Sequence, residues 1–427
     1  MAIDLLKGFR PYCPLLLKIH TFFYHFMLYH YSFLLLLWLI AFMGLSCMTD
    51  TAREHQIHTH LDASQTQLID MRAPLRDQRL ADYLKIKKII PLENSEQSVI
   101  QNVSNVYDTG HEFIISHHQS ATTKIFSHQG AYLYDIGRIG KGPGEYIVLL
   151  DTDYLSNEKL FFFYGRTKLI IYDLVKQTYW DHIPPFSAYY FEAFDANTYA
   201  FHFLGGPDES LGPYNVVITD KEFVVKNKTL PGARTKSLYV DSGYLGEAEE
   251  GFVFSHSYSD TVYYYDLQHE QTSIRYVFDF GTKRRQISRN HKEYNKIRIK
   301  EGFLKNPYYE DEQIFSFRCT DKGRLRGNIW LRKSGQLLSE ESFEHGGILL
   351  HLFPPRGRTR EGLYISAIVP GWYYTGLKYE DPGFMAFLQA DFPQLYEVSK
   401  ELNGMENPIL LIYELNTETA SSPSDGE

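Results

Sequence analysis

Short apolar runs that end in turn-forming residues recur along the middle of the chain. Each unit has two or more apolar residues, often with a tyrosine, then a polar or acidic residue and a turn. The six occurrences are KIFSHQGAYL, KLIIYDLVKQTYW, NVVITDKEFVV, TVYYYDLQHEQ, NIWLRKSGQLL and ILLIYELNTET. β-Branched and aromatic residues around a short turn favour two paired strands, so each unit predicts a β-hairpin.

The hairpins recur with a regular period. The residue that follows each apolar run marks the unit: Ser127, Asp173, Asp220, Asp266, Arg332 and Glu414. Successive markers are 46, 47, 46, 66 and 82 residues apart. A period near 46 is typical of propeller blades, which repeat about every 40–50 residues. The sequence therefore predicts an all-β fold, a six-bladed β-propeller over residues 83–415, with insertions in the last two intervals.

The last unit lacks a fourth strand of its own, because it lies almost at the end of the chain. The segment YLKIKKIIPLE, Tyr83 to Glu93, has the pattern of a strand and immediately precedes the first unit. If this segment completes the last blade, the ring closes and two sheet edges are covered. We expect the remaining residues, 416–427, to form a disordered tail.

The N-terminal region has a different pattern, which predicts a targeting segment over residues 1–46. An uninterrupted apolar run from Phe33 to Met43 has the length of a signal-peptide core and is followed by GLSC. Small and apolar residues before Cys47 are similar to the lipidation site of bacterial lipoproteins, although Gly44 replaces the usual leucine. An uncleaved anchor helix and translation from Met27 are the alternatives. Residues 47–82 read as a polar tether.

Composition narrows the class of partner. The chain of 427 residues has a formal charge of -9, and loss of residues 1–46 would leave -11, so we expect no affinity for nucleic acid. The three cysteines provide no disulfide framework for the folded part, and we expect Cys319 to be a buried small residue. We predict a monomer.

The stretch GRIGKGPGEY, residues 137–146, raises the question of phosphate binding. A Walker loop needs GxxxxGK followed by Ser or Thr and then a helix, and the glycine spacing here is different. The residues after the stretch read as a strand, so no helix N-terminus would be available to hold a phosphate. We predict a tight connection between two blades, with Pro143 between two glycines fixing its course.

The same stretch resembles the hallmark of a family of six-bladed β-propeller lipoproteins from gut-type Gram-negative bacteria. The family phrase is Ile-Gly-x-x-Gly-x-Gly-Pro-Gly-Glu-Tyr, and the resemblance extends over about residues 86–415. The matching positions are Ile136, Gly137, Gly140, Gly142, Pro143, Gly144, Glu145 and Tyr146. The resemblance implies the propeller fold, a lipid anchor at Cys47 and a place in the cell envelope, with the outer membrane expected. It implies no reaction, and catalytic residues cannot be transferred.

Motifs for chemistry are sparse. Neither a GxSxG nor an HExxH motif occurs, and we predict no cofactor and no structural or catalytic metal. Asp151, Asp153 and Asn157 suggest a calcium loop, but they lack its glycine turn and distal glutamate, so we favour a blade loop with capping carboxylates. His117 and His118 are expected at the surface of a strand end.

Candidate ligand contacts come from a basic block and an aromatic loop. Residues 283–333 carry 15 Lys or Arg against six Asp or Glu, and the part at about 283–312 reads as a helical insertion. A helix with a solvent-exposed basic face explains the excess of positive charge in this block. The alternative is a cap that attracts an anionic ligand. The candidate ligand-binding residues are Arg138, Lys141, Arg284, Arg285, Trp372 and Tyr373.

These features favour a non-catalytic binding module for a glycan, including acidic glycans, or for an envelope protein. A polysaccharide lyase or hydrolase with carboxylates at the propeller mouth is the alternative, because spacing cannot reveal carboxylates contributed by different blades. A scaffold without a small ligand is a third hypothesis. The ligand, the functional face and the side of the membrane are not encoded in these patterns.

Overall fold

The computed structural model describes residues 66–72, 80–203, 211–212, 214–231, 244–248, 250–255, 260–281, 303–321, 324–339, 352–371, 378–379 and 382–416 of the chain. These residues lie in one compact unit, Thr59–Glu427. The predicted targeting segment, Cys47, most of the predicted tether and the predicted tail after Asn416 are outside the described residues, and so are Arg284, Arg285, Trp372 and Tyr373.

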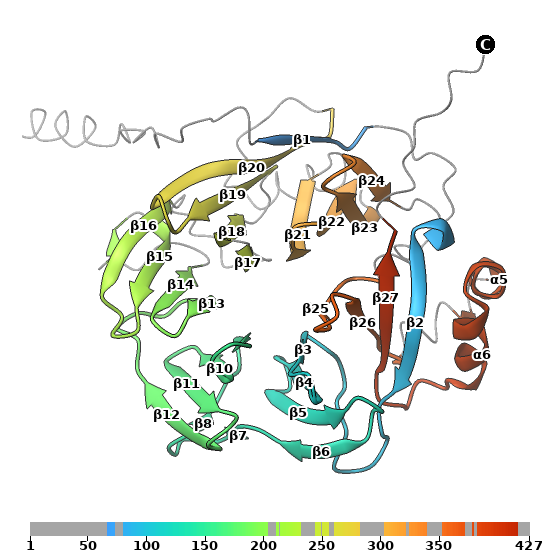
Figure 1. Cartoon of the computed structure of the whole chain (residues 1–427), viewed down its shortest axis with the longest axis horizontal. Coiled ribbons are helices and arrows are strands. Elements are labelled where there is room, and N and C mark those ends of the chain that lie inside the picture. Colours follow the sequence, from blue (N-terminus) through green and yellow to red (C-terminus); the bar gives the residue numbers. More distant parts are fainter. Residues whose placement is uncertain are drawn as a thin grey trace, which may run out of the picture. The chain divides into compact units, whose positions relative to one another are not determined.

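Six sheets are arranged around a common axis as the blades of a propeller, and this confirms the predicted fold (Figure 1). Each blade has four antiparallel strands ordered from the axis to the perimeter. Blade 1 contains β3 (Asn105–Asp108), β4 (Glu112–His117), β5 (Thr122–Ser127) and β6 (Tyr132–Asp135). Blade 2 contains β9 (Asp151–Leu155), β10 (Leu160–Gly165), β11 (Lys168–Asp173) and β12 (Thr178–His182). Blade 3 contains β13 (Tyr190–Asp195), β14 (Thr198–His202), β15 (Tyr214–Asp220) and β16 (Val225–Pro231).

Blades 4 to 6 follow the same plan. Blade 4 contains β17 (Tyr244–Ala248), β18 (Gly251–Ser255), β19 (Thr261–Asp266) and β20 (Gln271–Asp279). Blade 5 contains β21 (Phe303–Glu310), β22 (Ile314–Asp321), β23 (Arg324–Leu331) and β24 (Gln336–Ser339). Blade 6 contains β25 (Gly357–Arg358), β26 (Tyr364–Ile368), β27 (Ile409–Leu415) and β2 (Leu84–Pro91). The second strand of a blade has neighbouring blades on both faces. The apolar run Phe161 to Tyr164 in β10 is therefore buried on both faces.

The last blade closes the ring as the sequence predicts. Strand β2 pairs antiparallel with β27, from Leu84 opposite Leu415 to Pro91 opposite Ile409. The N-terminal strand thus becomes the outer strand of the C-terminal blade. The two ends of the propeller are held together by a ladder of backbone hydrogen bonds and by shared core residues.

In most blades the repeat markers recur because they have the same structural role. They end the third strand, and the marker side chain accepts backbone N–H groups of the following turn. Asp220 Oδ1 accepts from Glu222 and Val224 at 3.1 and 2.9 Å, and Ser127 Oγ accepts from Gln129 and Ala131 at 3.2 and 3.1 Å. Aspartate and serine can both cap a turn in this way, so serine keeps the turn of blade 1 intact.

A short segment of the predicted tether is a strand. Residues Gln67–Asp70 form β1, which pairs parallel with β20 and adds a fifth strand to blade 4. Ile69 is buried in the core of this blade, and the Trp330 indole N–H donates to Gln67 Oε1 at 3.0 Å. The tether prediction is therefore wrong here, because one buried apolar side chain outweighs the polar composition around it.

The predicted helical insertion is tested only in part, because its residues 283–302 lie outside the described residues. The prediction is wrong over Phe303–Glu310, which form the inner strand β21. Two helices that were not predicted, α5 (Pro382–Asp391) and α6 (Pro393–Glu401), lie between β26 and β27, outside β2 (Figure 1). Within the described ranges, neither has the length and hydrophobicity to cross a membrane.

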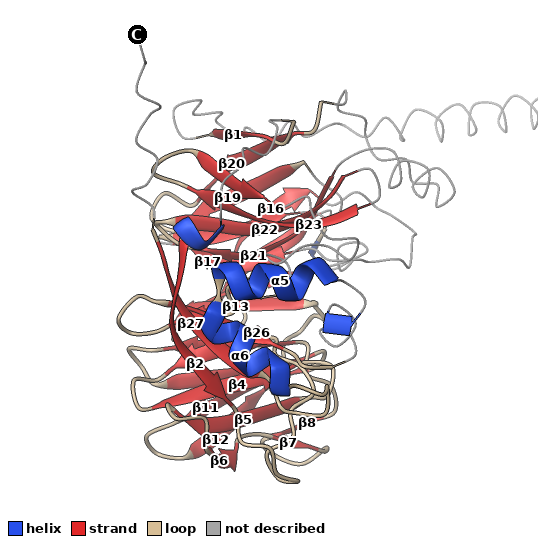
Figure 2. Ribbon diagram, turned by 90° about the vertical axis from the view of Figure 1, so that its right-hand side faces the viewer, coloured by secondary structure: helices blue, strands red, loops and turns tan. Residues whose placement is uncertain are grey.

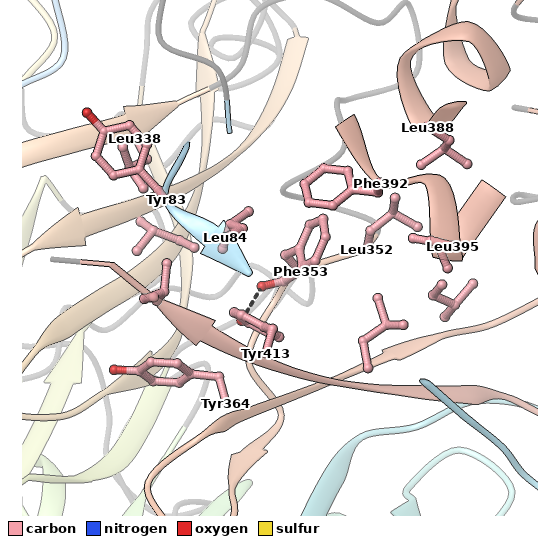
Figure 3. Close-up of a cluster of buried hydrophobic side chains, with 14 of the residues drawn as sticks. Tyr83, Leu84, Leu338, Leu352, Phe353, Tyr364, Leu388, Phe392, Leu395 and Tyr413 are labelled. Atoms are coloured by element: carbon pink, nitrogen blue, oxygen red, sulfur yellow. Dashed lines mark hydrogen bonds between the residues drawn. The ribbon is translucent and has the colours of Figure 1, made fainter. Parts of the chain in front are cut away.

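Both helices are attached through one large apolar cluster. Phe384 and Leu388 of α5 and Leu395 of α6 are fully buried with Leu352, Phe353 and Tyr413 of blade 6. Figure 3 shows these side chains converging, with the Tyr413 hydroxyl donating to the Phe353 carbonyl at 2.9 Å. The helices therefore extend the core of the closing blade.

The two faces of the ring differ in their connections. The turns between the first and second strands and between the third and fourth strands lie on one face, and the longest of them is residues 359–363. We call this the short-turn face; its turns form the left-hand edge in Figure 2. The other connections leave the opposite face, which we call the long-connection face. They include residues 92–104, 136–150, 280–302 and 369–408.

Candidate functional site

The inner strands of blades 2, 3 and 4 bring four carboxyl groups toward the propeller axis. We call Asp151, Asp153, Glu192 and Glu247 the axial carboxyl cluster; they belong to β9, β13 and β17. Each inner strand has one edge without a neighbouring strand, so its outward N–H and C=O groups need other partners. The axial side chains meet part of this need.

Carboxylates of one blade accept hydrogen bonds from the inner strand of the next. The Phe191 N–H donates to Asp151 Oδ2 at 3.2 Å and the Ala193 N–H donates to Asp153 Oδ2 at 2.8 Å. The Glu247 N–H donates to Glu192 Oε1 at 3.1 Å. Three members of the cluster therefore join consecutive blades.

A similar contact joins blade 1 to blade 2 through neutral groups. The Tyr107 hydroxyl donates to the Thr152 carbonyl, and the Asn105 amide donates to the same oxygen at 3.3 Å. Tyr107 has a strongly raised pKa because it is buried and lies near Asp153. Its hydroxyl is consequently a stable donor at all physiological pH values.

The axial carboxyl groups have unusual acidities. Burial raises the pKa of Asp151 to about 8, of Asp153 to about 6 and of Glu247 to about 7. Burial, followed by the charge of Asp153, also raises the pKa of Glu192 well above its usual range. Backbone N–H donors oppose these shifts but do not cancel them. The Glu247 side chain is nevertheless exposed, and the charge of Asp153 adds to the effect of desolvation on its pKa.

A basic group lies at another part of the axis, near blades 6 and 1. Arg356 precedes β25, and burial lowers its pKa to about 10. Burial lowers the pKa of His118 to about 3, and the nearby charges of His117 and Arg356 add to this effect. His118 is therefore neutral at physiological pH, and its Nε2 lies 3.2 Å from Thr152 Oγ1.

These histidines correct a prediction. They were expected at the surface, but His117 is buried and His118 is half-buried. The alternation of polar residues in β4 does not mark a solvent face, because neighbouring blades cover both faces of a second strand. Asp151 and Asp153 are likewise not in a loop; they lie on the inner strand β9.

Metal coordination by these acids finds no support in the geometry. Among the residues that the structure describes, no group of three or more His, Cys, Asp or Glu side chains is arranged to hold an ion. The oxygens of Asp151 and Asp153 accept backbone N–H groups instead. Asp151 and Asp153 therefore act as acceptors for backbone N–H groups.

The glycine stretch is a connection between blades 1 and 2, as predicted. It contains two short parallel strands, β7 (Arg138–Ile139) and β8 (Glu145–Tyr146). The Gly142 N–H donates to Glu145 Oε2 at 2.8 Å, and the Gly144 N–H donates to Asp181 Oδ1 at 2.9 Å. Carboxylates of the protein already occupy these N–H groups, so they are not open to a phosphate.

One lysine fixes this connection to blade 2. The Lys168 ammonium donates to the carbonyls of Gly142 and Glu145, both at 3.0 Å, and to Asp181 Oδ2 at 2.9 Å. Gly137 has φ +76°, and a Cβ there would lie 2.8 Å from Tyr146 and 2.9 Å from Phe163. The requirement for glycine at this position is therefore both conformational and steric.

Two of the predicted ligand contacts, Arg138 and Lys141, belong to this connection. Both are exposed, and Figure 1 places β7 and β8 beside the outer strands β6 and β12, at the perimeter of the ring. They are therefore separated from the axial carboxyl cluster. Glu192 and Glu247 were not singled out from the sequence; their only signal is an acidic residue within an otherwise apolar inner strand.

Fold and site together define a six-bladed β-propeller whose inner strands are joined by polar side chains. The chain belongs to the family described as Domain of unknown function (DUF4934), whose model matches residues 67–414. A comparison with curated proteins finds no match.

Solved structures share the fold at low sequence identity. A protein from Bacteroides fragilis, described as exported, is 14% identical, with a TM-score of 0.65 over 82% of this chain and 99% of that chain. A member of the DUF4221 family from Bacteroides vulgatus is 8% identical, with a TM-score of 0.49 over 79% of this chain and 99% of that chain. At such identities the likeness concerns the fold alone.

Proposed function

We propose that this chain is a non-catalytic recognition module of the bacterial cell envelope, which binds a glycan or a partner protein through its long-connection face. The division of connections between the two faces carries the proposal. A rigid ring that presents long connections on one side is suited to recognition, because variable segments are held in fixed relative positions.

The hydrogen bonds of the axial carboxyl cluster support binding over catalysis. Asp151, Asp153 and Glu192 each accept a backbone N–H of the next blade. A catalytic acid or nucleophile must approach its substrate, whereas these oxygens are engaged within the protein. These three members of the cluster therefore serve to join the inner strands of consecutive blades.

A polysaccharide hydrolase or lyase is the second candidate, and the acidities of the same cluster favour it. With a pKa of about 8 for Asp151 and about 7 for Glu247, both groups would be substantially protonated at neutral pH. A protonated carboxyl group beside an ionised one is the usual arrangement for acid catalysis of glycoside cleavage.

One experiment separates the two candidates. A protein of residues 60–427 would be tested for binding to neutral and acidic glycans, and each hit would be examined for cleavage products. We expect binding without product, at an affinity that Asp151→Asn leaves unchanged, because asparagine keeps an oxygen for the Phe191 N–H. Product that disappears in Asp151→Asn would instead establish the enzyme. If no glycan binds, the glycan version of the proposal is wrong and the protein partner remains.

Envelope attachment is proposed to occur through lipid at Cys47. The N-terminal pattern and the family resemblance support it. Metabolic labelling with a clickable fatty acid should mark the full-length protein and should fail for Cys47→Ala, which should also leave the membrane fraction. Retention of Cys47→Ala in membranes, unlabelled, would favour an uncleaved anchor helix.

A further inference from the structure

The long-connection end of blade 2 carries a group of exposed aliphatic side chains. Ile139, Ile147 and Ile183 are 64%, 64% and 77% exposed, and Val148 is 46% exposed. They come from the connections before and after blade 2, residues 136–150 and 183–189. Exposed apolar side chains are ordinary when scattered, but a group at one place marks an interaction site.

The backbone contacts bring these residues to one end of the blade. Lys168 and Asp181 at the ends of β11 and β12 bind the backbone of residues 142–145. A Cβ at Gly165, the end of β10, would lie 2.7 Å from the Val148 carbonyl. Ile183 directly follows β12. We give the name blade 2 patch to these four side chains together with three neighbouring cations. Its members are Ile139, Ile147, Val148, Ile183, Arg138, Lys141 and Arg166.

The charges of the blade 2 patch are positive. Arg138, Lys141 and Arg166 are exposed, and Arg166 is held by a hydrogen bond from its Nε to Ser187 Oγ at 3.3 Å. The nearby carboxylates are engaged internally: Glu145 by the Gly142 N–H, and Asp181 by Lys168 and the Gly144 N–H. Within the described ranges, Arg138 and Lys141 form no ion pair.

We propose that the blade 2 patch is a docking surface for a protein segment that carries both apolar and acidic side chains. This docking surface rests on the proposed function of the chain as a recognition module, and it specifies the kind of partner that the module binds. Apolar centres with charged rims are typical of protein interfaces, and charge complementarity selects an acidic partner.

Two other ligands fit the blade 2 patch less well. Sugar rings stack on flat aromatic faces, whereas the apolar side chains that define the blade 2 patch are isoleucine and valine; the exposed ring of Tyr179 lies beside Gly144, and a sugar would have to rely on it. An anionic membrane would attract the three cations but would repel the rest of a chain whose formal charge is -9. Because the cations are confined to one part of an acidic protein, an acidic protein segment fits the blade 2 patch better than an extended anionic membrane does.

Site-specific photo-crosslinking in intact cells tests the proposal. A benzophenone amino acid would replace Ile147 or Ile183 in the full-length protein, expressed in its host. The matched control is Val175, which is 76% exposed but lies in a turn of the short-turn face. We expect a discrete protein adduct from Ile147 and Ile183 and none from Val175. The crosslinked partner peptide should contain Asp or Glu.

Second-site variants make the result specific. With the crosslinker at Ile147, Ile183→Asp or the pair Arg138→Glu and Lys141→Glu should reduce the adduct about tenfold or more, as loss of an interface hot spot does. Val175→Asp should not change it. These side chains are exposed, so the fold should persist, which thermal unfolding would verify.

Three outcomes would overturn the docking surface: no adduct from either patch position, equal adduct from Val175, or adducts with lipid or glycan only. The glycan screen reports separately on the proposed function. Glycan binding without a patch adduct would refute the docking surface alone, and a patch adduct without glycan binding would refute only the glycan version of the proposed function.

Discussion

The short-turn face and the long-connection face are built from different kinds of contact. On the short-turn face, hairpins are closed by their own residues, as Asp220 and Ser127 cap the N–H groups of the next few positions. On the long-connection face, residues 137–146 depend on Lys168 and Asp181 of the next blade. Contacts within a hairpin produce a turn that recurs from blade to blade, whereas contacts between blades produce a connection that is specific to one place in the ring.

The pair of β2 and β27 joins the two ends of the propeller, and its loss should have the largest effect. A protein that begins after Pro91 lacks β2 and leaves β27 as an open edge. We expect loss of cooperative unfolding, since a typical domain is stable by only about 5–15 kcal/mol. Circular dichroism during heating would measure it. A protein that begins at residue 73 lacks only β1 and should still unfold cooperatively; equal behaviour of the two proteins would contradict ring closure by β2.

The glycine connection provides the next largest effect. Gly137→Ala combines φ +76° with a clash against the buried rings of Tyr146 and Phe163. We expect a loss of about 2–4 kcal/mol in the free energy of unfolding. Gly212→Ala is the matched control, because Gly212 has φ +79° but nothing within 4 Å, and should cost about 1 kcal/mol. Equal losses in denaturant titrations would show that packing across the blades is unimportant at Gly137.

The axial carboxyl cluster predicts a pH dependence. The folded pKa of Asp151, about 8, is above its usual 3.8, so the folded state binds more protons than the unfolded state between these values. Stability from this group is fully present below about pH 4 and is lost as pH rises toward 8.

The substitution Asp151→Asn removes the loss of stability at high pH and keeps an oxygen that can accept the Phe191 N–H. The variant should be more stable than the parent at pH 9, by roughly 1–3 kcal/mol, with little difference at pH 4. Denaturant unfolding at both pH values measures it, with Glu158→Gln at an exposed turn as the control. A destabilised variant at pH 9 would mean that the ionised carboxylate is required to join blades 2 and 3.

The smallest effects are expected on the short-turn face. Asp220→Ala removes the acceptor for two turn N–H groups and should cost about 0.5–1.5 kcal/mol. Ser127→Asp, which introduces the aspartate found at the markers of blades 2 to 4, should change stability by less than about 0.5 kcal/mol. Thermal unfolding would measure both. A loss at Asp220 as large as that at Gly137 would remove the distinction between local and inter-blade contacts.

The sequence alone determined the repeat, the number of blades and the way the ring closes. These properties follow from local patterns: apolar runs of strand length, turn-capping residues at the markers, and one unpaired strand pattern at Tyr83 to Glu93. The glycine spacing likewise excluded a phosphate loop, because that motif needs a fixed local order of residues. Cys319 is buried, as expected for a small apolar residue.

The axial carboxyl cluster and the blade 2 patch were decided only by the tertiary structure. Asp153, Glu192 and Glu247 are separated by many residues in the chain and meet because consecutive blades place their inner strands around one axis. The acidity of a carboxyl group depends on burial and on charges from other blades, which no local pattern encodes. For the same reason, the polar residues His117 and His118 were expected at the surface but lie between blades, where the fold covers both faces of their strand.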